Sequence, residues 1–107
     1  MSRLKDKVAI VTGSGAGIGK AIAEEFAKEG AQVVCATRFP EEGKPVADAI
    51  AKEGGKAFFV KCDVSSEADV KAMTAATIQK YGRIDVLVNN AGVNIGKPFE
   101  QVEVEDW

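Results

Sequence analysis

Four glycines fall within seven positions near the N-terminus, in the segment running from position 13 to position 19. Glycine at this density disfavours helix and strand, because each glycine loses much backbone entropy on ordering. An apolar run precedes the segment and a helical pattern follows it, which is typical of a turn with backbone N–H groups exposed beside a helix N-terminus. Such groups, together with the positive end of the helix dipole, bind phosphate. The candidate anion-binding residues are Gly13, Ser14, Gly15, Gly17, Ile18 and Gly19.

The spacing of these glycines indicates which nucleotide-binding motifs the segment matches and which it does not. A nucleoside-triphosphate P-loop requires Gly-x-x-x-x-Gly-Lys-[Ser/Thr], but Ser14 stands where its first glycine belongs and Ala21 where its hydroxyl belongs. The general dinucleotide pattern Gly-x-Gly-x-x-Gly also fails, since the third glycine is Gly17 and position 18 is isoleucine. Gly13-x-Gly15-x-Gly17 matches the loop of S-adenosylmethionine methyltransferases, which therefore remain an alternative.

Composition excludes several other kinds of site. The chain has no histidine, which removes Ser-His-Asp and Cys-His nucleophiles and histidine-ligated metals, and we expect no metal site. A net charge of −2 gives no basic excess for nucleic acid. Cys35 and Cys62 form no CxxC pair and lie in apolar runs, so we interpret them as buried hydrophobic residues. With no signal peptide or membrane segment apparent, we expect a cytoplasmic protein that does not bind membranes.

The residues that could bind a ligand are connected by alternating strand and helix patterns. Apolar runs typical of strands buried on both faces cover Lys7–Thr12, Gln32–Thr37, Lys56–Lys61 and Ile84–Asn89. Helical spacing predicts helices from Ile18 to a stop at Gly30, over Glu41–Glu53, and from an N-cap at Ser65 or Ser66 to about Gly82. This order predicts an α/β fold with right-handed crossovers and a parallel sheet.

The length of the chain limits the size of this sheet. A βαβ unit needs roughly 30 residues, so the 107 residues hold about four strands of a single domain. With the strand order 3-2-1-4, the run Ile84–Asn89 would form an apolar edge with nothing paired beyond it. The final segment, Gly96–Trp107, is predicted to be a loop that enters a helix.

Three motifs make the sequence resemble the short-chain dehydrogenase/reductases. Thr12-Gly13-x-x-x-Gly17-x-Gly19 is similar to the cofactor turn of that family, and Asn89-Asn90-Ala91-Gly92 is similar to its second motif. Asp63-Val64 resembles its adenine-contacting pair. The resemblance covers the whole chain. Within the family it is a general similarity to β-ketoacyl-acyl carrier protein reductases and to their sugar- or steroid-alcohol relatives, and no residue distinguishes these subgroups. It implies a Rossmann-type doubly wound parallel sheet, of which residues 1–107 are the N-terminal, cofactor-binding part.

The resemblance also implies roles for particular residues. Gly13 would allow the sharp turn, Gly17 the approach of the pyrophosphate, and Gly19 close packing of helix and strand. Asp63 would accept a hydrogen bond from the adenine amine, with the Val64 backbone beside it; the alternative is a carboxylate that serves the helix start near Ser65. Asn89 is interpreted as structural, tying neighbouring strand ends together. The residues expected along the cofactor ribose are Asn90, Ala91 and Gly92.

The end of the second strand bears on the choice of dinucleotide. An acidic residue there would hold the ribose hydroxyls of NAD, but the chain has Thr37-Arg38, and its nearest acids, Glu41 and Glu42, follow Pro40. An uncharged hydroxyl followed by a guanidinium suits a 2′-phosphate, which arginine binds bidentately. We therefore expect NADP rather than NAD.

The catalytic residues of the family have no counterpart in the chain. Its Tyr-x-x-x-Lys pair lowers a phenol pKa for proton transfer, whereas the single tyrosine, Tyr81, is followed four residues later by Asp85. We expect the catalytic half of an alcohol–carbonyl oxidoreductase, which would act on a small molecule as a homodimer or homotetramer, to lie outside this chain. A non-catalytic dinucleotide-binding module or sensor is the alternative.

Overall fold

The computed structural model describes residues 4–15, 17–89 and 102–104. Strands and helices alternate along most of the chain, as the sequence pattern predicts. The elements are β1 (Val8–Thr12), α1 (Gly17–Lys28), β2 (Gln32–Thr37), α2 (Pro40–Lys52), β3 (Lys56–Lys61), α3 (Glu67–Tyr81), β4 (Val86–Asn89) and β5 (Val102–Val104). No helix in these ranges is long and apolar enough to cross a bilayer.

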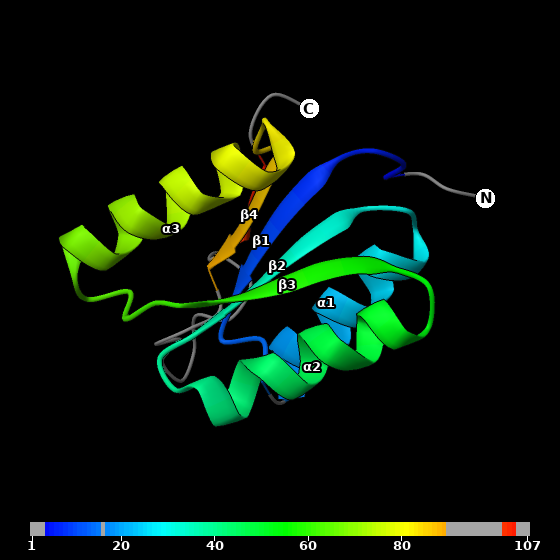
Figure 1. Cartoon of the computed structure of the whole chain (residues 1–107), viewed down its shortest axis with the longest axis horizontal. Coiled ribbons are helices and arrows are strands. Elements are labelled where there is room, and N and C mark those ends of the chain that lie inside the picture. Colours follow the sequence, from blue (N-terminus) through cyan, green and yellow to red (C-terminus); the bar gives the residue numbers. More distant parts are fainter. Residues whose placement is uncertain (1–3, 16, 90–101, 105–107) are drawn as a thin grey trace.

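The sheet has the order β3-β2-β1-β4-β5, and its first four strands are parallel (Figure 1). This confirms the predicted 3-2-1-4 order of a Rossmann-type sheet. Thr12 at the end of β1 pairs with Ala36 of β2 on one side and with Asn89 of β4 on the other. The carboxyl ends of the central strands therefore meet at one edge of the sheet.

The prediction of a loop entering a helix was wrong for residues 102–104, and the rest of Gly96–Trp107 lies outside the described residues. Strand β5 pairs antiparallel with β4, joining Val86 to Val104 and Val88 to Val102, where the sequence suggested a loop entering a helix and an unpaired β4. An edge strand presents unpaired N–H and C=O groups that another extended segment satisfies. The sequence Val-Glu-Val has the β-branched alternation that suits such pairing.

Helices cover both faces of the sheet. Helices α1 and α2 lie on one face and α3 lies on the other (Figure 1). The N-cap of α3 is Ser66, whose side chain accepts a hydrogen bond from the Asp69 amide, and its C-cap is Gly82 with φ 85°. The structure thus selects Ser66 over Ser65 as the N-cap.

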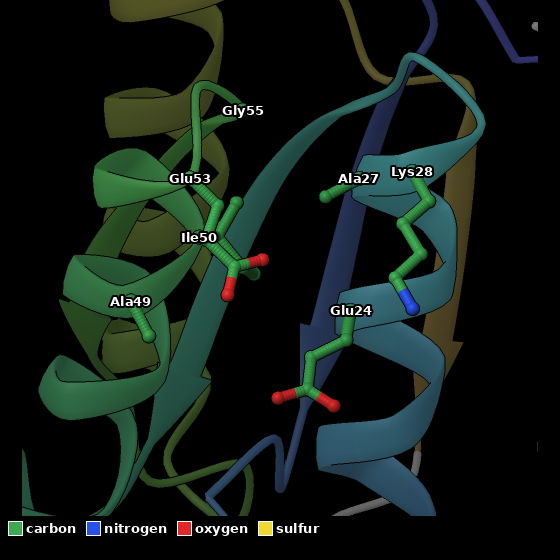
Figure 2. Close-up of a pocket in the computed structure, with 7 residues that line it drawn as sticks. All are labelled: Glu24, Ala27, Lys28, Ala49, Ile50, Glu53 and Gly55. Atoms are coloured by element: carbon green, nitrogen blue, oxygen red, sulfur yellow. The ribbon is translucent and has the colours of Figure 1, made fainter.

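The second halves of α1 and α2 enclose a groove of about 230 Å³ (Figure 2). Charged side chains of both signs line it, namely Glu24 and Lys28 of α1 and Glu53 after α2. These residues lie near the helix ends that precede β2 and β3. The groove is therefore at the opposite edge of the sheet from the glycine turn.

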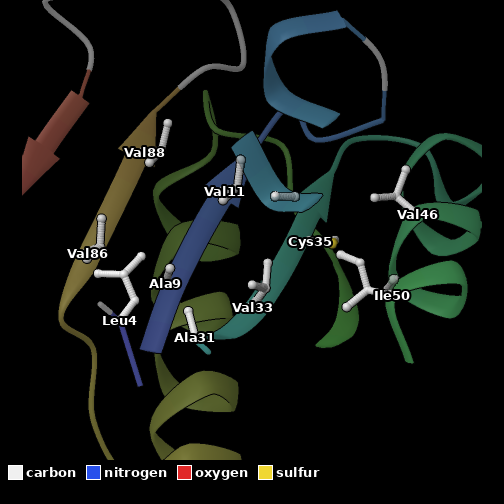
Figure 3. Close-up of a cluster of buried hydrophobic side chains, with 12 residues drawn as sticks. Leu4, Ala9, Val11, Ala31, Val33, Cys35, Val46, Ile50, Val86 and Val88 are labelled. Carbon is white, nitrogen blue, oxygen red and sulfur yellow. The ribbon is translucent and has the colours of Figure 1, made fainter. Parts of the chain in front are cut away.

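The larger apolar cluster lies between the sheet and the pair α1 and α2 (Figure 3). Val11 and Val33 of the central strands are fully buried in it, and Val46 and Ile50 reach it from α2. A smaller cluster on the opposite face joins Ile10 and neighbouring strand residues to α3. Burial on both faces explains why β1 and β2 are continuous apolar runs in the sequence.

Asp85 joins the amino ends of β1 and β4. Its backbone N–H donates to the Val8 carbonyl over 2.8 Å, and its carboxylate accepts the Val8 N–H over 2.8 Å. The other carboxylate oxygen accepts from Arg83 at 2.6 and 3.0 Å. Only 4% of Asp85 is exposed, so a buried carboxylate fixes the start of both strands.

Candidate cofactor-binding site

Three of the predicted ligand-binding segments meet at the carboxyl edge of the sheet. The Gly13 amide donates to the Ala36 carbonyl over 2.9 Å, which ties the glycine turn to β2. The Cys62 amide donates to the Thr37 carbonyl over 2.8 Å, which ties the segment before Asp63 to the same strand. The glycine turn, the end of β2 and the start of the β3–α3 loop therefore surround one region, although they are far apart in sequence.

The glycine turn has the backbone conformation that its sequence requires. Gly13 and Gly17 have φ values of 64° and 58°, in the left-handed region that other residues rarely adopt. A Cβ placed on Gly17 would have no neighbouring atom of the described residues within 4 Å. Gly19 is buried within α1. The turn thus has a sharp bend at Gly13, open space beside Gly17 and close packing at Gly19.

The N-terminus of α1 suits an anion. The first turn of α1 contains no acidic residue, whereas α2 and α3 begin with two each. Acidic side chains there would neutralise the positive end of the helix dipole, which in α1 stays available. Ile18, at the start of the helix, is 52% exposed and offers an apolar surface beside the open space.

Ser14 is not placed to use its side chain for a ligand. It is completely buried, and its hydroxyl has no full hydrogen bond with another described residue. Burial raises the pKa of the neighbouring Cys35 thiol to about 11, and the Ser14 hydroxyl opposes that shift only partly. Any contribution of Ser14 to binding comes from its backbone.

Both cysteines are buried, as predicted, and this gives a simple chemical test. With a pKa of about 11, roughly one Cys35 thiol in a thousand is ionised at about pH 8. Burial also raises the pKa of Cys62, with Asp69 and Asp63 adding to the shift. Neither cysteine of the folded chain should react with a disulfide reagent at that pH, and both should react in denaturant. Labelling of the folded chain at the rate of a free thiol would contradict this.

The Thr37 side chain makes its hydrogen bond within the protein and not to a ligand. Only 2% of it is exposed, and its hydroxyl donates to the Phe39 carbonyl over 2.6 Å. This hydroxyl was expected to suit a 2′-phosphate, but in the structure it is already bonded to Phe39. Position 37 therefore favours NADP only in that it carries no negative charge.

Arg38 and Asp63 approach each other across the ends of β2 and β3. The guanidinium Nε lies 3.8 Å from the Asp63 carboxylate, and the same group lies over the Phe39 ring at 5.4 Å. The arginine side chain is 67% exposed. An exposed ion pair of this length contributes little to stability, so the guanidinium can turn toward a bound phosphate.

Asp63 is held by a compact hydrogen-bond network. One carboxylate oxygen accepts from the Ser65 hydroxyl at 2.6 Å and the Ser65 amide at 2.9 Å. These bonds, and to a lesser degree Arg38, keep the pKa of Asp63 below its ordinary value. The Asp63 amide donates to Asp69 over 3.0 Å. Sequence reasoning missed Asp69, although Ser66-x-x-Asp69 has the spacing of a capping box.

Of the remaining predicted residues, Asn89 and Val64 are described by the structure and three others are not. The Thr12 hydroxyl donates to the Val88 carbonyl at 3.2 Å and to the Asn89 side chain at 3.3 Å, which agrees with a structural role for Asn89. Val64 packs against the apolar cluster on the α3 face. Three further predicted residues lie outside the described part of the chain: Asn90, Ala91 and Gly92.

The sequence analysis named Glu42 only as an acid that follows Pro40, but the structure brings it against the glycine turn. A Cβ on Gly15 would lie 2.6 Å from both the Cβ and the carbonyl oxygen of Glu42. Helix α2 thus begins directly against the glycine turn. No local sequence signal indicates this contact, because it depends on how the crossover after β2 packs.

Comparison with known proteins extends these observations. A sequence model of the short chain dehydrogenase family matches residues 7–107. The chain is 48% identical over its whole length to a 3beta-hydroxysteroid dehydrogenase from Mediterraneibacter gnavus, of which it covers 39%. It is 47% identical, over 92% of its length, to a 7alpha-hydroxysteroid dehydrogenase from Escherichia coli, of which it covers 38%. The chain therefore spans about two fifths of the length of these relatives.

Solved structures agree with the sequence comparison. The crystal structure of a hydroxysteroid dehydrogenase from Escherichia coli superimposes with a TM-score of 0.81 at 48% identity. That match covers 84% of this chain and 37% of the other. Both the sequence and the strand arrangement thus correspond to one part of longer proteins.

Proposed function

The chain belongs to the short chain dehydrogenase family, and from this premise we propose that it is the cofactor-binding part of an oxidoreductase. The complete protein would interconvert an alcohol and a carbonyl with a nicotinamide dinucleotide as hydride carrier. The observation that carries the proposal is the open space at Gly17, beside a helix N-terminus without acidic residues. A diphosphate fits this combination of exposed amides and positive dipole.

We assign the adenosine half of the dinucleotide to the region between the glycine turn and the ends of β2 and β3. The Asp63 carboxylate oxygen that Ser65 does not occupy lies 3.8 Å from the Arg38 Nε, and it would accept from the adenine amine once Arg38 turns toward the phosphate. Backbone groups of Val64 would lie next to it. Asn90, Ala91 and Gly92 would follow the ribose nearer the nicotinamide.

NADP is the proposed form of the cofactor. Position 37 carries no negative charge, and the exposed Arg38 makes a weak ion pair with Asp63 and a contact with the Phe39 ring. A guanidinium that can turn outward binds a 2′-phosphate bidentately. NAD would lack this contact.

Titration of the purified chain with the two reduced cofactors tests this proposal. NADPH should bind about 10-fold more tightly than NADH, a ratio worth about 1.4 kcal/mol. Arg38→Ala should remove most of that difference and leave NADH binding nearly unchanged. Fluorescence of the bound nicotinamide or calorimetry measures both affinities. Equal binding of NADPH and NADH would contradict the choice of NADP, and tighter binding of S-adenosylmethionine would contradict the family of cofactor.

The residues that transfer the substrate proton are proposed to lie outside this chain. Tyr81 packs with its ring 5.5 Å from Phe58, and burial raises its pKa, so it is unsuited to give up a proton. We expect cofactor binding without turnover. The substrate of the complete protein is proposed to be a small molecule with a ring-borne hydroxyl, since hydroxysteroid dehydrogenases are among the similar proteins. A cytoplasmic homo-oligomer is the expected form.

A further inference from the structure

Glu42 brings a negative charge to the edge of the glycine turn. It is the third residue of α2, and its side chain is exposed. Both its Cβ and its carbonyl oxygen come so close to Gly15 that any side chain at position 15 would collide with them at 2.6 Å. The start of the Glu42 side chain is therefore directly beside the turn.

Contacts around Thr37 hold Glu42 in this place. The Phe39 carbonyl accepts the Thr37 hydroxyl at 2.6 Å and the Glu42 amide at 3.0 Å, so one oxygen connects the end of β2 to the first turn of α2. A Cβ on Gly43 would lie 2.8 Å from the Thr37 side chain, which shows how closely the helix approaches the strand. The position of Glu42 is thus set by its backbone amide and by the packing of the first turn of α2 on Thr37, and not by its own exposed side chain.

The charges around this position are not balanced among the described residues. Within these ranges, the ion pairs join Arg38 to Asp63, Lys71 to Glu67 and Arg83 to Asp85, and none includes Glu42. Arg38 is the cation that follows β2, and it faces Asp63. The exposed Glu42 carboxylate, whose Cβ lies beside Gly15, therefore has no ion-pair partner among the described residues.

We propose that Glu42 is a second determinant of the dinucleotide choice, which opposes a 2′-phosphate and so weakens the preference that Arg38 creates. This inference rests on the proposed function. The adenosine ribose would lie between the glycine turn and Arg38, and Glu42 borders the same space. A phosphate there meets one attractive and one repulsive group, whereas the ribose hydroxyls of NAD meet no such repulsion.

Coulomb's law sets the size of the effect. A carboxylate and a 2′-phosphate about 6 Å apart in a water-like environment repel by enough to change affinity about 3- to 10-fold, since the phosphate carries more than one charge. Salt would reduce the effect, because both groups are exposed. A purely steric role of Glu42 would not depend on salt.

The test compares Glu42→Gln with Glu41→Gln in the full chain. Both substitutions remove an acid from the first turn of α2, so their effects on helix stability match. Adenosine 2′,5′-bisphosphate and adenosine 5′-monophosphate serve as probes, since they differ only in the 2′-phosphate. Calorimetry at low and high salt measures their binding, and circular dichroism confirms the fold of each variant.

We expect Glu42→Gln to tighten binding of the bisphosphate about 3- to 10-fold at low salt and to leave the monophosphate nearly unchanged. Glu41→Gln should have a smaller effect, and Glu42→Asp should behave as the original chain does. Equal effects of Glu42→Gln and Glu41→Gln, or an equal gain for both probes, would overturn the inference. Absence of binding of either probe to the folded, unsubstituted chain would instead overturn the proposed function, and the inference with it.

Discussion

Gly17→Ala is expected to weaken dinucleotide binding about 10- to 100-fold while the chain stays folded. Gly17 has φ 58°, a conformation that costs an L-residue about 1–2 kcal/mol. The added methyl group would also project into the open space that we assign to the diphosphate. Titration with NADPH measures the loss of affinity, and urea unfolding measures the accompanying loss of stability.

Gly54→Ala is the matched control. Gly54 has φ 94°, and a Cβ there would also have no neighbour within 4 Å among the described residues, but it precedes β3 at the opposite edge of the sheet. Its substitution should cause similar strain without changing cofactor affinity. If Gly54→Ala reduced affinity as much as Gly17→Ala does, the loss would reflect general destabilisation, and the glycine turn would not be the binding site.

Asp85→Ala is expected to lower the free energy of unfolding by about 3–4 kcal/mol. The substitution leaves the completely buried Val8 amide without its acceptor and removes the two hydrogen bonds from Arg83. An unsatisfied buried donor costs about 1–3 kcal/mol, and loss of the hydrogen bonds to the half-exposed Arg83 adds to this. Urea unfolding followed by circular dichroism measures the change.

Glu67→Ala provides the comparison for Asp85. Glu67 forms an ion pair with Lys71 at 3.8 Å, but both side chains are largely exposed. Glu67→Ala should lower the free energy of unfolding by at most about 0.5 kcal/mol through the loss of this ion pair. A loss as large as that of Asp85→Ala, or a loss below about 1 kcal/mol for Asp85→Ala itself, would show that burial of the carboxylate does not decide its effect.

The contribution of Asp85 should also depend on pH. Burial raises its pKa, but hydrogen bonds from Arg83 and Val8, with the charges of Arg83 and Lys7, bring it below the ordinary value of 3.8. A carboxyl group with a lower pKa in the folded state stabilises the fold above its unfolded pKa and loses this effect as the pH falls through the folded pKa. The original chain should therefore lose more stability than Asp85→Asn between about pH 5 and pH 3.

Much of the fold could be predicted from local patterns. Continuous apolar runs located β1, β2 and β3 to within one residue, because strands buried on both faces need apolar side chains at every position. The start of β4 was placed two residues early, since Ile84 is apolar like the strand that follows, whereas Asp85 between them serves as an anchor. The ends of α3 followed from Ser66 and Gly82, whose capping geometry depends on neighbouring residues only.

The site could be predicted only in part. The sequence located the glycine turn, but it gave no reason to expect that the Thr37 hydroxyl turns inward or that Asp69 supports Asp63. These contacts depend on which backbone carbonyl or amide of the folded chain lies within hydrogen-bond distance of the side chain. A side chain's type is known from the sequence, whereas its partner is not.

By itself, the sequence determined the order of elements from β1 to β4, the parallel character of the central sheet and the position of the glycine turn, because these follow from short-range periodicity and from the conformations open to glycine. Only the tertiary structure decided that Glu42 lies against Gly15, that Asp85 holds Val8 across 77 residues, and that β5 pairs with β4. Such contacts depend on strand register and on how each crossover packs on the sheet. No local window of the sequence contains both partners.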